Sequence, residues 1–168
     1  MAMTPSGMAD YIQSHVRGAT DAVTAINNFY RALCEYVEMN AIVTYSWAAV
    51  DPTNFNLPDP ITVITCDIKT AGFLSPSGLS TPEAALSRFS ADLNTQASLW
   101  SVTWPPGFEI SPAFVLPTIN LTLSYATEMG SAWLHLCTQI IAGLKAATPV
   151  GSGVHGKFIG SASFISLM

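Results

Sequence analysis

The residues of this chain that are best suited to chemistry are three histidines and three cysteines, and their spacing forms no recognised catalytic unit. His135 and Cys137 stand two positions apart in a segment with helical periodicity, so their side chains point to different faces of that helix. They cannot form a nucleophile–base pair from one helix alone. Cys34 and Cys66 also belong to no CxxC motif. We predict that all three cysteines are buried thiols that act as small apolar side chains.

The other two histidines have simpler structural interpretations than catalytic ones. His15 stands beside a helical apolar stripe, which is typical of a hydrogen-bonded core or interface histidine. His155 lies in the glycine-rich segment GSGVHGKFIG, which superficially suggests a phosphate loop. That segment lacks the Walker spacing, and it neither clearly follows a strand nor clearly opens a helix. We interpret it as a flexible hinge that precedes a strand.

The acidic residues are scattered, and none forms a general acid–base pair with another. Asp51 and Asp59 precede prolines and are typical turn formers. Asp67 follows Cys66 in an apolar strand, where burial would raise its pKa and make it a proton donor. A solvated position at the strand end is the simpler interpretation. GxSxG and HExxH motifs are absent from the sequence, which therefore predicts no catalytic residue, metal ligand or cofactor, and no enzyme.

The composition indicates a protein that associates with other proteins. Of 168 residues, 49% are hydrophobic and only 10% are charged, with a net charge of −5. Soluble domains carry roughly 25% charged residues, so this chain is short of the groups that keep a lone monomer in solution. Its six basic residues are spread along the chain and form no basic face. Direct binding to nucleic acid or to anionic lipid is therefore not expected.

Targeting and membrane segments are not predicted. The N-terminal residues MAMTPSGMADY have no basic region followed by an apolar one, so they do not form a secretory signal. The most apolar long segment, SAWLHLCTQIIAGLKAA, is short for a membrane span and contains His135, Gln139 and Lys145. Unless the protein is part of an assembled particle, we expect it to be intracellular and soluble.

Two apolar stripes with alternating steps of four and three residues predict the long helices. The first predicts one helix over about 8–40, with Gly18 as its weak point, and the second a helix over about 118–147. This 3.5-residue period is typical of helices that pack side by side. Gly130 and Ala126 form a small-residue notch where another helix can approach. Uncharged residues flank the first stripe, which predicts burial on more than one side: Gln13, His15, Thr20, Ala22, Asn27, Phe29, Cys34 and Tyr36.

Shorter elements lie between and after these helices. A helix over 81–100 is predicted from its first three residues. Thr81 suits the N-cap, Pro82 suits the first helical position, and the negative charge of Glu83 complements the helix dipole. Alternation over 41–50 fits a strand, although this segment could extend the preceding helix. The remaining expectations are turns over 51–60, a strand buried on both faces over 61–68, a loop over 69–80, a long apolar loop over 101–117 and a terminal strand over 157–168.

The predicted fold class is α+β and helix-dominated. Two long helices with 3.5-period seams and a shorter helix pack with a small sheet and a C-terminal extended strand or arm. The chain is expected to form one domain over 1–168. Residues 1–7 are a loose leader, residues 8–150 the core, and residues 151–168 a glycine-hinged strand or arm.

In general character the sequence resembles small virion structural proteins of tailed bacteriophages. The resemblance lies in GSGVHGKFIGSASFISLM, as an extended terminal arm, and in TWPPGFEISPAFVLP, as an ordered long loop. It implies a neck, tail or baseplate component that is located in the virion and contacts itself or other structural proteins. An apolar-ligand-binding module and a membrane-associated protein are the alternatives. The candidate interface residues are large and apolar: Trp104, Phe108, Phe114, Phe158, Phe164 and Ile165.

Overall fold

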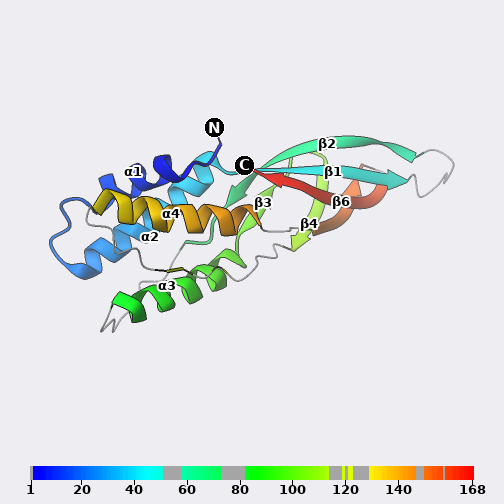
Figure 1. The fold of residues 1–168 in the computed structure, drawn as a ribbon. Coiled ribbons are helices and arrows are strands. Elements are labelled where there is room, and N and C mark those ends of the chain that lie inside the picture. The colour runs from blue at the N-terminus through cyan, green and yellow to red at the C-terminus, as the bar shows by residue number, and fades with distance from the viewer. Residues whose placement is uncertain are drawn as a thin grey trace.

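The computed structural model describes residues 2–50, 58–72, 82–113, 119, 121–122, 129–146, 150–156 and 158–168. Within these ranges the chain forms four helices and one six-stranded antiparallel sheet, which confirms the α+β class. Helices hold more residues than strands, and they gather at one end while the long strands extend from the other (Figure 1). The order is α1 Pro5–Val16, α2 Ala22–Asn40, β1 Ile42–Val50, β2 Pro58–Lys69, α3 Pro82–Ala97, β3 Ser101–Thr103, β4 Phe108–Ala113, α4 Met129–Lys145, β5 Val150–His155 and β6 Phe158–Leu167.

The expected single helix over 8–40 is wrong, because the chain turns between α1 and α2. Gly18 has a φ of 88°, a left-handed conformation that ends a helix and that glycine adopts without a steric penalty. Asp21 then caps α2, since its carboxylate accepts a hydrogen bond of 2.9 Å from the amide of Thr24. The apolar stripe continues through both helices, so it gave no sign of the break.

The leader is not loose. Pro5 starts α1, Thr4 caps this helix by accepting a 3.2 Å hydrogen bond from the amide of Gly7, and Met3 is buried in the core. The first residues of the described chain therefore belong to the packed helical end.

The second half of α2 is buried on more than one side, as its uncharged flanks predict, whereas the earlier flanking residues Thr20, Ala22 and Asn27 are exposed. Phe29 packs against Phe89 of α3 at a ring-centroid distance of 5.0 Å and against Trp133 of α4 at 5.6 Å. On another side, Tyr36 lies 5.9 Å from Tyr11 of α1 by the same measure. Three helices thus surround this part of α2 and form the helical core.

The second long helix is shorter than expected. It begins at Met129, while Ile119, Leu121 and Thr122 lie outside any helix or strand, and residues 123–128 and 147–149 fall outside the described ranges. The close approach on α4 is not at Gly130, which has open space around it, but at Gly143, where Ile119 packs.

The strands lie in the order β3-β2-β1-β6-β5-β4. Residues 41–50, for which the sequence left strand and helix open, contain strand β1, which pairs with β2 and β6. The expectation that β2 is buried on both faces is wrong, because Ile64 and Cys66 are buried while Val63 is 66% exposed. Of the expected turns and loop around this strand, residues 51–57 and 73–80 fall outside the described ranges, and Pro58 already belongs to β2.

The segment 101–117 is not a single long loop, because β3 and β4 occupy most of its described part. These strands are the two edges of the sheet, yet only residues 104–107 connect them. The link from Thr103 to Phe108 spans at most about 17 Å. In a flat sheet the edge strands would lie about 24 Å apart. The sheet must therefore curl, which creates an inner and an outer face.

The expected hinge and terminal arm form a hairpin within the sheet. The glycine-rich segment is strand β5, and β6 lies between β5 and β1. One of its glycines, Gly153, packs closely, and Gly156, directly after β5, has a φ of 60°, which glycine adopts without a steric penalty. A Cβ on Gly153 would collide with the backbone of Glu109 and Ile110 in β4. The predicted terminal strand is confirmed, and the predicted hinge is wrong.

Candidate functional site

The cysteines show no sign of chemical activation. All three are free and buried, as predicted. Burial raises the pKa of the Cys34 and Cys66 thiols to about 11 and that of Cys137 to about 12. His135 is exposed while Cys137 is buried, so they lie on different faces of α4, as their spacing predicts.

His15 belongs to a polar cluster that joins α1 to α2, which confirms its predicted structural role. Its Nδ1 atom lies 2.8 Å from the carbonyl oxygen of Tyr11, and its Nε2 atom lies 3.8 Å from a carboxylate oxygen of Glu35. The Tyr11 hydroxyl donates to the same carboxylate at 3.0 Å, and Arg31 lies 3.6 Å from its other oxygen. These groups are hydrogen-bond and ion-pair partners of one another, and they hold α1 against α2.

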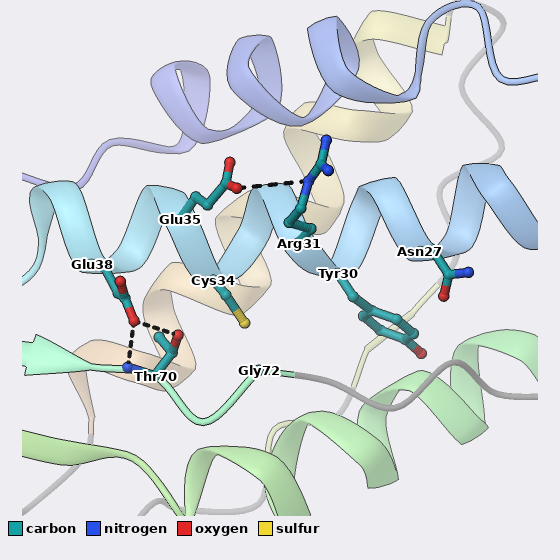
Figure 2. A pocket seen from close by; sticks show the side chains of 8 residues that line it. All are labelled: Asn27, Tyr30, Arg31, Cys34, Glu35, Glu38, Thr70 and Gly72. Carbon is teal, nitrogen blue, oxygen red and sulfur yellow. Dashed lines mark hydrogen bonds and ion pairs between the residues drawn. The ribbon is translucent and has the colours of Figure 1, made fainter.

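A pocket of about 400 Å³ lies between α2 and the end of β2 (Figure 2). Glu38 accepts hydrogen bonds from Nζ of Lys69 at 2.9 Å and from the Thr70 amide and hydroxyl at 2.9 and 2.8 Å. The charged groups in this wall therefore already have partners, and we assign the pocket no reaction. Its lining residues are Asn27, Tyr30, Arg31, Cys34, Glu35, Glu38, Thr70 and Gly72.

Most of the predicted interface aromatics lie inside the curled sheet. Tyr45 packs against Trp104 at a ring-centroid distance of 4.6 Å and against Phe164 at 6.4 Å. Phe108 lies 5.6 Å from Trp47 by the same measure. Sequence analysis did not predict this arrangement because it interpreted 101–117 as a loop, whereas the curl of the sheet turns Trp104 and Phe108 inward.

The other candidates divide between the inner and outer faces. His155 stacks on Phe108 at 4.1 Å with nearly parallel rings, so the glycine-rich segment presents this ring to an aromatic neighbour. Phe158 is half-buried against the core, and Ile165 is 51% exposed. Phe114 falls outside the described ranges.

The outer side of the curled sheet is the most distinctive surface of the described chain. Three large apolar side chains are exposed there: Val63 at 66%, Ile159 at 56% and Ile165 at 51%. The strand register places Ser46 between Val63 and Ser163, so the surface crosses from β2 through β1 to β6. We call this surface the neutral face, and we define it by Ser46, Val63, Thr65, Ile159, Ser161, Ser163 and Ile165.

The neutral face carries no formal charge. Strands β1, β5 and β6 contain no Asp, Glu, Lys or Arg residue. The charged residues of β2 that the structure describes in full, Asp67 and Lys69, stand at the end of this strand near the helices. Sequence analysis identified Ile165 but not Val63 or Ile159, because the adjacent Ile64 and Phe158 are also apolar and no alternation marks the exposed face there.

Comparisons with protein family models, with curated proteins and with solved structures find no match for this chain. None of the described helices combines the length and the apolar character that a membrane span requires. The same ranges hold no group of three or more His, Cys, Asp or Glu side chains that could bind a metal ion. The neutral face is the candidate functional site because large apolar side chains are exposed on it and none of its residues is charged.

Proposed function

We propose that this protein is a non-enzymatic structural protein that assembles with copies of itself or with other structural proteins through its neutral face. The observation that carries the proposal is the exposure of Val63, Ile159 and Ile165 on an uncharged sheet surface. Burial of apolar area contributes about 25 cal/mol per Å², and no charge on this surface has to be desolvated. Contact surfaces are typically depleted of charge at their centre in the same way.

The charge distribution supports contact at this surface. Each copy carries a net charge of −5, so two copies repel each other at most approaches. A neutral surface minimises that repulsion, and it is compatible with a second neutral surface. The described ion pairs lie elsewhere, on α1, α2 and α3 and at the helix-proximal end of β2.

The helical end supplies rigidity in this proposal. We propose that the 3.5-period stripes serve internal packing, because Tyr30, Leu33 and Val37 of the first stripe are buried. A rigid helical end then holds the extended sheet in a fixed orientation for its partners (Figure 1).

We propose the virion of a tailed bacteriophage as the setting, with the protein as a neck, tail or baseplate component. The support is the general character of the sequence together with an extended sheet that carries the uncharged and partly apolar neutral face. The alternative of an apolar-ligand module has less support, since Tyr45 and Trp47 fill the sheet interior.

The test is the solution mass of the purified chain as a function of concentration, by sedimentation velocity and light scattering. We expect the wild type to form a defined oligomer. Ile165→Lys combined with Val63→Lys places two charges on the neutral face and should weaken association at least tenfold. Leu99→Lys is the matched control, because Leu99 is 62% exposed but follows α3. A wild type that stays monomeric near millimolar concentration, or a control as disruptive as the double variant, would contradict the proposal.

A further inference from the structure

Two hydrogen-bond donors lie buried and unpaired inside the curled sheet. The side chain of Tyr45 is fully buried, and its hydroxyl has no partner among the described residues. The indole nitrogen Nε1 of Trp104 is likewise buried and has no partner there. The two rings pack against each other with centroids 4.6 Å apart and planes tilted by 41°.

The surroundings of these donors are apolar. Phe164 packs against the Tyr45 ring, and Phe108 lies 6.4 Å from the Trp104 ring between centroids. Buried polar groups nearly always have a hydrogen-bond partner, because an unpaired one loses its hydration without compensation. Tyr36 shows the ordinary case in this chain, since its hydroxyl both donates to and accepts from the backbone of Thr4.

The kind of acceptor follows from the chemistry of the site. An indole N–H only donates, and an oxygen atom with two lone pairs can accept from both Trp104 and Tyr45. The acceptor must be uncharged, because none of the residues shown to pack around the two rings is a lysine or arginine that could balance a buried anion. A water molecule meets both conditions. Cys66, whose sulfur is a weak acceptor, lies on the same inner face of β2, two register positions from the Tyr45–Ile64 pair.

We infer that the interior of the sheet binds one water molecule, which accepts hydrogen bonds from the Tyr45 hydroxyl and the Trp104 indole. Trp104 opens the four-residue link, residues 104–107, that joins the two edge strands. A water molecule shared with β1 therefore fastens this link across the inner face. This inference does not depend on the proposed assembly function.

The first test compares the melting temperatures of two Tyr→Phe variants. A paired hydroxyl stabilises the fold, so Tyr45→Phe should lower the melting temperature by about 3 °C, in the direction of the matched control Tyr36→Phe. An unpaired hydroxyl destabilises the fold, so its removal would leave the melting temperature unchanged or raise it. Either of those results would overturn the inference.

The second test detects the water molecule directly by NMR. The indole proton of Trp104, assigned by its loss in Trp104→Phe, should show a dipolar cross-peak to a long-lived water molecule. That cross-peak should weaken or disappear in Tyr45→Phe while the other indole signals stay in place. A wild-type spectrum without the cross-peak would show that no such water is bound.

Discussion

The hydroxyl of Tyr36 in α2 holds the start of α1, because it accepts a hydrogen bond from the amide of Thr4 and donates one to the carbonyl of the same residue, both at 3.2 Å. Since Thr4 caps α1, this pair connects the cap of one helix to the C-terminal part of its neighbour. The N-terminal residues are thereby fixed on the helical core.

Removing this hydroxyl should loosen the junction. Tyr36→Phe breaks both hydrogen bonds and leaves two backbone groups of Thr4 without this partner. We expect the free energy of unfolding in urea to fall by about 1–2 kcal/mol. A loss below about 0.3 kcal/mol would mean that water replaces the hydroxyl at no cost.

Two glycines of α4 should respond in opposite ways to alanine. A Cβ on Gly143 would collide with Cγ1 and Cδ1 of Ile119, which is buried, so Gly143→Ala should cost about 1–3 kcal/mol in stability. Gly130 has no atom within 4 Å of that position, so Gly130→Ala should stabilise the fold by about 0.5 kcal/mol through helix propensity. Urea denaturation of both variants measures the difference. Stabilisation by both would show that Ile119 does not pack against α4.

The stability contributed by Glu38 should disappear in acid. The hydrogen bond from Lys69, and to a smaller extent those from Thr70, hold the pKa of this carboxyl below its ordinary value of 4.5. Because the folded-state pKa is the lower one, the contribution is complete above pH 4.5 and is lost as the pH falls through the folded-state pKa. Glu38→Gln should therefore cost about 1 kcal/mol at pH 7, a value that allows for solvent screening, and less at pH 3. Urea denaturation at both pH values tests this, and an equal cost at both would contradict it.

The three cysteines should react only after unfolding. A thiol with a pKa near 11, as burial gives Cys34 and Cys66, is ionised to only about one part in a thousand at pH 8. We expect Ellman's reagent to find no rapidly reacting thiol in the native protein at pH 8 and all three in guanidinium chloride. One fast native thiol would show that a cysteine lies in a more open environment.

Local patterns in the sequence determined several elements of the fold. Periodicity, capping chemistry and β-branched composition predicted α3, strand β2 and the terminal strand, because these signals act within one segment, whereas residues 41–50 were left open between strand and helix. Burial of the cysteines also followed from residue type. The same signals led to the wrong prediction of one helix through Gly18, since an apolar stripe is compatible with one long helix and with two packed helices.

The candidate site was predicted only in part. Ile165 stood among the candidates, whereas Val63 and Ile159 stand next to the apolar residues Ile64 and Phe158, so no local alternation marked them as exposed. Nothing local shows that β1 pairs with β6, whose residues follow it by more than a hundred positions, so nothing local places Val63 and Ile165 on one surface.

Only the tertiary structure decided which face of each strand meets solvent. The register across distant strands depends on which side chains the whole sheet can bury. The curl of the sheet, which brings β3 close to β4, separates an inner face from an outer one. It turned Trp104 and Phe108 inward around Tyr45 and left the uncharged residues outside. The sequence by itself determined that this chain has few charges and much apolar surface, whereas long-range strand pairing decided where that surface lies.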